Sequence, residues 1–207
     1  GTRNSFIIGT CATFLATALG TVAALGLSRP NMPFKGTIMA ILISPMIVPL
    51  IITAAGMFFF YSKVGLTHSY LGLILAHTAL GTPFVVITVT ATLTGFDTNL
   101  IRASQSLGAD TMRTFFKVIM PLILPGVISG GLFAFITSFD EVVVVMFVGS
   151  VEQITIPKQM WAGLRQETSP VILCMATCLV ALSIALLTTV ELLRRRSERL
   201  RGIKLRN

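Results

Sequence analysis

The chain has 207 residues, of which 54% are hydrophobic and 12% are charged, and its formal net charge at pH 7 is +8. A soluble domain carries roughly 25% charged residues, and a protein of this length has too little interior to hide so many apolar side chains. The composition therefore excludes an ordinary soluble domain and makes a lipid bilayer the natural surroundings of the chain.

Five apolar stretches are each long enough to cross a bilayer as a helix, which takes about 20 residues. Their periodicity is helical rather than alternating, and each stretch is too long for a strand of a membrane barrel. The predicted spans are residues 5–27, 36–60, 69–93, 122–148 and 170–193. We therefore expect an all-α polytopic transmembrane helix bundle that forms a single domain over residues 1–207.

Small residues lie on one face of two of these predicted helices. In the first span they recur every four residues from Ala12 to Ala24, and in the fourth span Gly126 and Gly130 form a GxxxG pair. Such residues let helix backbones approach closely in lipid. The pattern favours tight packing within one subunit and leaves dimerisation through the same face as an alternative.

Prolines interrupt three of the predicted spans. Pro45 and Pro49 lie in the second span, Pro83 lies in the third, and Pro121 and Pro125 open the fourth. Each removes a backbone hydrogen bond, which membranes tolerate where a neighbour or a wet cavity satisfies the freed carbonyl. The prolines indicate helices that bend around a pathway, although ordinary kinks explain them nearly as well.

The basic residues orient the predicted bundle. Twelve of the sixteen Lys and Arg residues lie in the first loop, the third loop or the basic tail at 194–207, and the other four are Arg3, Lys63, Lys158 and Arg165. The positive-inside rule makes the twelve-residue side, and with it the tail, cytoplasmic. The net charge is then a topology signal and an attraction to anionic headgroups rather than evidence for nucleic acid.

This orientation puts Gly1 on the outer side, although no export signal precedes it and the chain starts without Met. An upstream span would account for both observations. We therefore expect six spans in the full protein, five of them in this chain.

The polar segment at 96–121 is predicted to be a cytoplasmic hairpin of two short amphipathic helices. Leu100 and Leu107 share one face of the first helix, Gly108 supplies the tight turn, and Asp110 fits the N-cap of the second helix. A structured loop of this kind between spans suggests a docking site for another protein.

Two aromatic side chains of this hairpin, Phe115 and Phe116, are more apolar than a solvated loop needs. Exposed aromatic residues on a cytosolic hairpin fit a groove on a partner. The alternative is that they fold back onto the bundle or into the headgroup layer, and the residues alone favour neither interpretation.

Two carboxylates, Asp140 and Glu141, lie deep in the fourth apolar stretch. They are roughly 27 Å along the helix from Leu122, toward the outer end. Each would cost at least about 2.5 kcal/mol at the bilayer centre, so they should face a cavity, a partner or the interface. One interpretation is a polar outer gate or a transient site for a cationic substrate; the other is a capping or interhelical hydrogen bond. The candidate pathway residues are Thr137, Ser138, Phe139, Asp140 and Glu141.

The spacing of the hairpin resembles the EAA loop of ABC importer permeases, in which small residues, a glycine, nine further residues and an apolar-x-apolar-Pro pattern follow one another. The pattern stands here as Ala103, Ser104, Gly108, Val118, Met120 and Pro121. The resemblance implies a type I ABC importer permease fold, with coupling helices that sit in a cleft of the ATP-hydrolysing subunit. The candidate coupling residues are Arg102, Ala103, Ser104, Leu107, Gly108, Ala109, Asp110, Phe115 and Phe116.

The sequence departs from that family pattern at one charged position. The leading Glu of the family is Arg102 here, and its second Ala is Ser104. The ion pair that the Glu would make with the ATPase is therefore not expected in its usual form, whereas the residues that shape the hairpin are retained.

Further segments resemble the spermidine/putrescine-type subfamily of these permeases. They are residues 138–144, residues 156–161 and the Ser169–Pro170 pair that opens the last span, and the similarity extends from Ser5 to about Arg196. It implies a polyamine substrate such as putrescine or spermidine. Related permeases carry other small solutes, which remain the alternative.

The resemblance also implies partners and a location. The chain would be a multi-pass subunit of the bacterial inner membrane that pairs with a second permease, alike or different, and binds an ABC ATPase dimer. A periplasmic binding protein would deliver the substrate. ATP and Mg would be held by the ATPase, because this chain lacks a GxxxxGK[ST] motif, and we expect neither enzymatic activity nor a cofactor here. The alternative class is an ATP-independent channel or an ion-coupled transporter, which would need coupling-ion residues in the nearly charge-free spans.

The outer loop before the last span carries Lys158, Trp161 and Arg165. The indole of Trp161 suits the headgroup boundary, so anchoring is the simplest role for this loop. Contact with the periplasmic binding protein is the more specific alternative. His77 is expected to be a packed residue on a helix face rather than a ligand.

Overall fold

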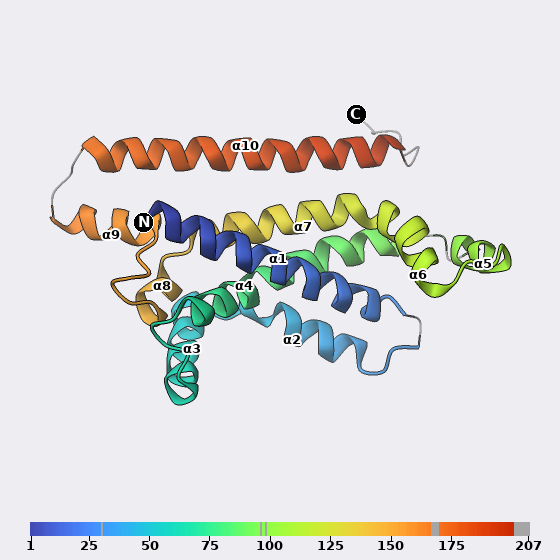
Figure 1. Cartoon of the computed structure of the whole chain (residues 1–207), viewed down its shortest axis with the longest axis horizontal. Coiled ribbons are helices and arrows are strands. Elements are labelled where there is room, and N and C mark those ends of the chain that lie inside the picture. The colour runs from blue at the N-terminus through green and yellow to red at the C-terminus, as the bar shows by residue number, and fades with distance from the viewer. Residues whose placement is uncertain (30, 96, 98, 167–169, 201–207) are drawn as a thin grey trace.

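The computed structural model describes residues 1–29, 31–95, 97, 99–166 and 170–200, and within these residues every regular element is helical. The long helices run side by side along one axis of the molecule, with α10 along one side and the short helices α5 and α6 at one end (Figure 1). The elements are α1 (Thr2–Leu27), α2 (Lys35–Ile47), α3 (Leu50–Val64), α4 (Tyr70–Thr94), α5 (Asn99–Ser106), α6 (Thr111–Thr114), the π-helical segment η1 (Phe115–Ile119), α7 (Met120–Asp140), α8 (Val143–Val148), α9 (Ile156–Gln166) and α10 (Pro170–Leu200).

The all-α bundle expected from the sequence is confirmed. Among the described residues, four helical segments are long and apolar enough to cross a membrane, and a fifth candidate arises if α2 and α3 count as one span. The four are Thr2–Leu27, Tyr70–Thr94, Thr111–Asp140 and Leu173–Leu192.

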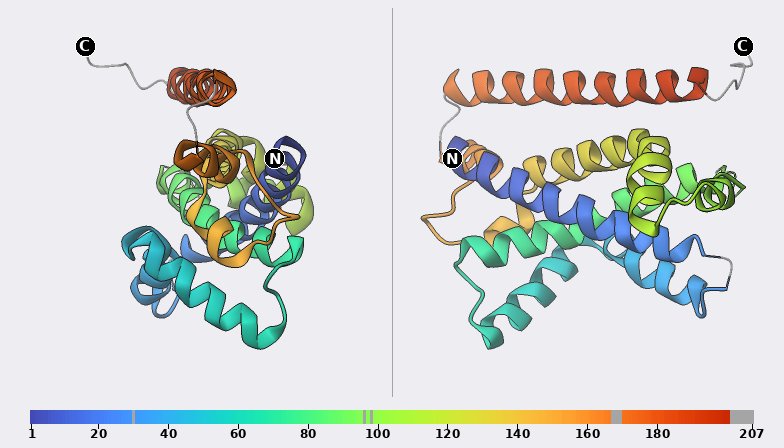
Figure 2. Two further views of the ribbon diagram at one scale, coloured as in Figure 1. Left: turned by 90° about the vertical axis from the view of Figure 1, so that its left-hand side faces the viewer. Right: turned by 45° about the vertical axis from the view of Figure 1, so that its right-hand side comes forward.

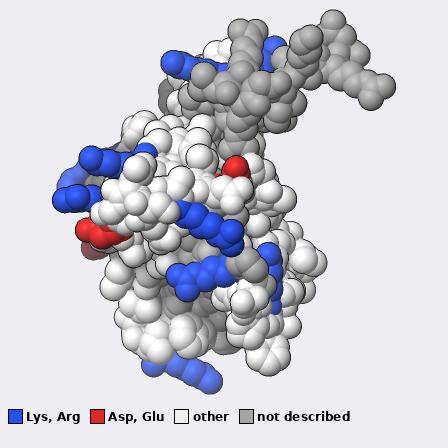
Figure 3. Space-filling model, turned by 90° about the vertical axis from the view of Figure 1, so that its right-hand side faces the viewer, with Lys and Arg blue, Asp and Glu red and all other residues white. Residues whose placement is uncertain are grey.

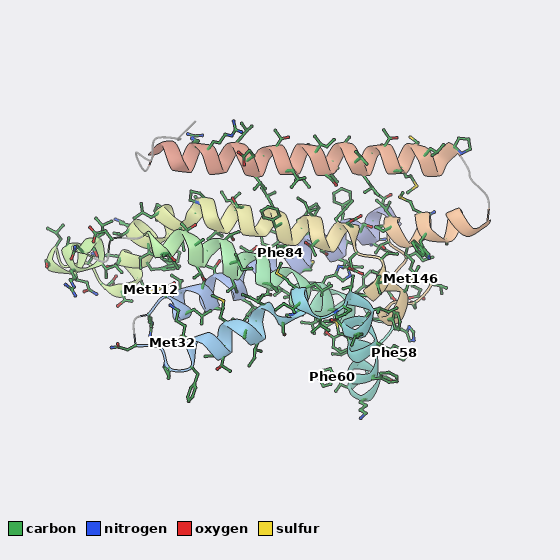
Figure 4. All side chains as sticks on the ribbon, turned by 180° about the vertical axis from the view of Figure 1, so that it is seen from behind. Met32, Phe58, Phe60, Phe84, Met112 and Met146 are labelled. Carbon is green, nitrogen blue, oxygen red and sulfur yellow. The ribbon has the colours of Figure 1, made fainter. Side chains whose placement is uncertain are left out.

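The second apolar stretch, expected as one span at 36–60, is broken into α2 and α3, which meet at an angle of 105°. Val48 is extended at the break, with φ −71° and ψ 133°, and Pro49 follows it. A proline disfavours the helical conformation of the residue before it, so Pro49 favours the extended conformation of Val48 and the end of α2. As a result α3 projects away from the bundle and carries Phe58 and Phe60 outward (Figures 2 and 4).

The glycines of the GxxxG pair hold α7 against α4. A Cβ added at Gly130 would lie 2.7 Å from the Cα of Val85, and one added at Gly126 would meet the hydroxyl of Thr92. Gly20 of α1 approaches the same part of α4, where an added Cβ would lie 2.6 Å from the Cβ of Val85. Both small-residue faces are therefore occupied by packing within the chain, and the alternative of dimerisation through them is not supported.

Two buried clusters follow from this packing. One joins α1, α4 and α7 through Ala16, Ala24, Val85, Val89, Ile123 and Ala134. The other joins α1, α3, α4 and α8 through Ile8, Ala54, Tyr61, Leu73, Ala76, Leu80, Val144, Val145 and Val148. By contrast, only 6% of the apolar part of α10, within Leu173–Leu192, is buried inside the chain. The main packing within the chain is thus among α1, α4 and α7, and α10 presents most of its surface outward.

The fourth apolar stretch, expected as one span at 122–148, also divides. α7 ends at Asp140, Glu141 is extended with ψ 124°, and α8 begins two residues later. The side-chain Oε1 of Glu141 accepts a hydrogen bond from the backbone N–H of Val144 at 2.8 Å. An acceptor at this position satisfies a first-turn N–H group of the new helix, which stabilises the break.

The expected tail at 194–207 and the expected loop at 96–121 coincide only in part with the described elements. α10 continues to Leu200 and so includes the first part of the basic tail expected at 194–207, while residues 201–207 lie outside the described residues. Within the loop expected at 96–121, Phe96 and Thr98 are also outside them, as is Ser169 before α10.

Candidate coupling hairpin and substrate pathway

The segment from α5 to η1 forms a hairpin whose turn depends on a glycine. Gly108 has φ +80°, a conformation that residues with a Cβ adopt at a cost. Asp110 is the N-cap of α6, as predicted, and its Oδ1 accepts a hydrogen bond from the backbone N–H of Arg113 at 2.7 Å. A hydrogen bond of 2.8 Å between the hydroxyls of Ser104 and Thr114 joins α5 to α6. The two helices are thus fixed to each other by a turn, a cap and a side-chain contact.

The two phenylalanines of the hairpin have different surroundings. Phe115 is half-buried and lines a cavity against the bundle, whereas Phe116 is 58% exposed. Their rings meet edge to face, with centroids 5.0 Å apart. Of the two interpretations left open by the sequence, folding back onto the bundle therefore describes Phe115, and exposure on the surface of the hairpin describes Phe116.

The other predicted coupling residues are mainly on the outer surface. Leu107 at the turn is 89% exposed, and Arg102 and Ala103 on α5 are exposed as well. Ser104 and Ala109 are half-buried. The hairpin therefore carries exposed side chains on two helices whose relative position is fixed by the turn at Gly108, the cap at Asp110 and the bond between Ser104 and Thr114.

The hairpin is joined to α7 without a break. Pro121 has no N–H and its ring would clash with the carbonyl four residues earlier, and the chain adopts the π-helical segment η1 just before it. The N–H of Met120 bonds to the carbonyl of Phe115, five residues earlier. The second helix of the hairpin and α7 thus form one continuous helical segment, in which α7 is 21 residues and so roughly 30 Å long.

A cavity lies at the opposite end of α7. It has a volume of about 350 Å³ and is lined by Leu50, Ile136, Thr137, Asp140, Glu141, Val142 and Val143. Leu50 is the first residue of α3. The break between α2 and α3 and the break between α7 and α8 therefore meet at this cavity. Pro45 and Pro49 predicted a bend in the second stretch, but no local pattern in the sequence places that bend beside α7.

The two carboxylates at this cavity have different environments. Glu141 is only 7% exposed and its Oε1 caps α8, whereas Asp140 is exposed at the cavity. A carboxylate that accepts a backbone N–H bond is engaged in the fold, and an exposed one is available to a passing cation. The capping interpretation therefore describes Glu141, and Asp140 is the residue that could meet a substrate.

The other predicted pathway residues are divided in the same way. Thr137 lines the cavity, but Ser138 and Phe139 are buried against other helices. The ring of Phe139 stacks on Phe135 with centroids 5.3 Å apart and meets Phe6 edge to face at 5.2 Å. Phe139 therefore holds α7 in the bundle and does not line the cavity.

Sequence reasoning missed a buried pair beside this site. Nδ1 of His77 on α4 lies 2.7 Å from Oγ of Ser138 on α7, and His77 is 1% exposed. The pair links α4 to α7 close to the point where α7 ends. His77 was expected to be a packed residue, which it is, but no local pattern indicates a partner 61 positions away.

We expect His77→Leu to destabilise the bundle by about 1–2 kcal/mol, because it removes this buried hydrogen bond. His77→Asn should retain most of the stability, since its amide can reach the position of Nδ1. Thermal unfolding of the two variants in detergent measures the difference. A leucine variant as stable as the wild type would show that the bond contributes nothing.

The outer loop is anchored by its own polar contacts. Nζ of Lys158 donates hydrogen bonds to the carbonyls of Val145 at 3.2 Å and Ser150 at 3.4 Å, and burial lowers the pKa of Lys158. Trp161 on α9 is 46% exposed, and the side chain of Arg165 lies outside the described part of the structure. Lys158 therefore stabilises the loop after α8, and Trp161 is the candidate that remains for contact with a lipid headgroup or a binding protein.

Comparison with known proteins gives the family of the chain. Residues 16–199 match the family described as "Binding-protein-dependent transport system inner membrane component". The spermidine/putrescine transport system permease protein PotC of Haemophilus influenzae is 32% identical over 194 residues, which cover 94% of this chain and 76% of that protein. The putrescine transport system permease protein PotI of Escherichia coli K12 is 30% identical over 186 residues, which cover 85% of this chain and 65% of that protein.

Solved structures share the fold. An inward-facing structure of the MetNI methionine ABC transporter matches with a TM-score of 0.70 and 21% identity, over 99% of this chain and 94% of the other. A crystal structure of an amino acid ABC transporter with histidines matches with a TM-score of 0.67 and 16% identity, over 95% of this chain and 92% of the other. The chain therefore belongs to the binding-protein-dependent transport system inner membrane components, the permease subunits of ABC importers.

Proposed function

We propose that this chain forms half of the membrane pathway of a polyamine importer and couples that pathway to ATP hydrolysis on a separate subunit. Permeases of this family are not themselves enzymes, and ATP is bound by the partner ATPase. The proposed assembly contains an ABC ATPase dimer, a second permease and a periplasmic binding protein. The basic tail and the hairpin face the cytoplasm, in agreement with the distribution of Lys and Arg.

The observation that carries this proposal is the continuity of α7. The helix begins at the hairpin, through η1, and ends at the cavity that Asp140 and Leu50 line. Closure of the ATPases would displace the hairpin, and α7 would carry that displacement to the cavity. The buried contacts of α7 with α1 and α4 would make the three helices move together rather than separately.

The polyamine assignment rests on the relatives PotC and PotI together with the exposed Asp140. An exposed carboxylate attracts a cation without the strong binding that would slow release. Other small cationic solutes are the alternative. Proteoliposomes that contain the assembled importer should take up labelled putrescine or spermidine when the importer's cognate binding protein delivers it. A binding protein with no affinity for either compound would remove the polyamine assignment and leave the importer class intact.

We expect Asp140→Asn to lower uptake at limiting polyamine concentration by about tenfold, a loss of roughly 1.4 kcal/mol of attraction. Glu141→Gln is the matched control, because its amide oxygen can still accept the N–H of Val144 and preserve the cap. Initial rates over a range of polyamine concentrations test both variants. Equal rates for Asp140→Asn and the wild type would exclude Asp140 from the pathway.

A further inference from the structure

The exposed surface of the hairpin combines apolar side chains with positive charge. Its apolar part, here called the apolar tip, consists of Leu100, Leu107, Met112 and Phe116, which are 43%, 89%, 65% and 58% exposed. None of the residues in α5 is buried, so the helix contributes little to the bundle's own core. Apolar side chains with this exposure in a cytosolic segment indicate a contact surface.

Three exposed cations accompany the apolar tip: Arg102 on α5, Arg113 on α6 and Lys117 on η1. The hydrogen bond between Ser104 and Thr114 brings α5 and α6 together close to Arg102 and Arg113. Figure 3, which looks onto this end of the molecule, shows Lys and Arg side chains gathered there with few acidic ones.

The acidic residues in the described part of the hairpin do not form ion pairs with these cations. Oδ1 of Asp97 accepts the backbone N–H of Asn99 at 2.9 Å, and Oδ1 of Asp110 accepts that of Arg113 at 2.7 Å. Both carboxylates are engaged at the starts of helices. Within the part of the chain that the structure describes, no ion pair joins Arg102, Arg113 or Lys117 to a carboxylate.

The position of the hairpin favours a protein partner over the membrane surface. α5 lies beyond the ends of α1, α4 and α7 along the axis of the spans (Figures 1 and 2). Leu107 and Phe116 would have to turn back toward the bundle to enter the acyl region. An extended hairpin of this kind instead reaches a subunit placed below the membrane.

We propose that the ATPase groove that receives this hairpin has an apolar floor for the apolar tip and an acidic rim that faces Arg102 and Arg113. This inference rests on the proposed function and adds the chemistry of the partner surface. Complementary charge at the rim of an interface guides association and selects the partner, while the apolar centre supplies most of the affinity. The hairpin would therefore discriminate against ATPases whose groove carries a basic rim.

The test measures the affinity of the cognate ATPase for the full permease in lipid nanodiscs, at salt concentrations between about 50 and 300 mM. The wild-type affinity should fall as salt rises. Arg102→Glu and Arg113→Glu should each weaken binding about tenfold at low salt and flatten the salt dependence. Lys35→Glu, which makes the same kind of charge change at the first residue of α2, should alter the affinity by less than about twofold.

A second variant separates the two parts of the proposal. Leu107→Asp should abolish binding without affecting thermal unfolding, because the side chain is exposed. If it does so while both arginine variants bind like the wild type, the hairpin docks but the acidic rim is wrong. If the wild-type permease does not bind the ATPase and its hairpin is instead protected by anionic lipid, the proposed function fails as well. Restoration of Arg102→Glu binding by an acid-to-lysine change in the ATPase groove would establish the pairing.

Discussion

Gly130→Leu should prevent the bundle from folding. A Cβ at this position would lie 2.7 Å from the backbone Cα of Val85, and neither helix can move away without opening the α1–α4–α7 core. Overpacking usually costs about 1–3 kcal/mol, and a clash with backbone lies at or above the top of that range. We expect little monodisperse protein after extraction and a thermal transition far below that of the wild type.

Gly56→Leu is the matched control for this prediction. Gly56 also lies within a helix, α3, but an added Cβ there has no atom within 4 Å. This variant should therefore be extracted and should unfold like the wild type. If Gly130→Leu behaves like the control, α7 does not pack on α4 as closely as the structure shows.

Gly108→Val should leave the bundle folded and reduce ATP-driven uptake by about tenfold or more. The site has open space around it, so the effect arises from backbone strain at φ +80° rather than from a clash. Such strain costs about 1–3 kcal/mol and would favour hairpin conformations that no longer fit the ATPase. Uptake and nucleotide hydrolysis by the reconstituted complex measure the loss.

Gly108→Asn separates strain from the mere presence of a side chain. Asn adopts the left-handed conformation more readily than Val, so most of the coupling should remain. If valine and asparagine lower uptake equally, the turn conformation of Gly108 is not what coupling requires.

The sequence predicted the membrane bundle and the hairpin because their signals are local. Apolar stretches of helical length identify the spans, and the turn at Gly108 and the cap at Asp110 depend on neighbouring residues only. The GxxxG pair indicated close packing, but only the structure shows that Val85 and Thr92 of the same chain lie against these two glycines. Dimerisation and internal packing use the same residues, so the pattern alone could not separate them.

The candidate pathway was predicted less completely, because it depends on how distant segments meet. Asp140 and Glu141 are neighbours in sequence, yet one lies at a cavity and the other caps α8. The contribution of Leu50 follows from a 105° bend whose direction Pro49 does not specify. The bond between His77 and Ser138 likewise depends on the packing of α4 against α7.

The central claim is that this chain transports its substrate only when an ATPase acts on the hairpin. The most direct measurement is uptake of labelled polyamine by proteoliposomes that contain the permease pair, the ATPase and the binding protein, with ATP on the side of the hairpin. We expect uptake with hydrolysable ATP and none with a hydrolysis-deficient ATPase or without the ATPase subunit. Uptake at an undiminished rate in the absence of the ATPase would identify a channel or an ion-coupled transporter instead.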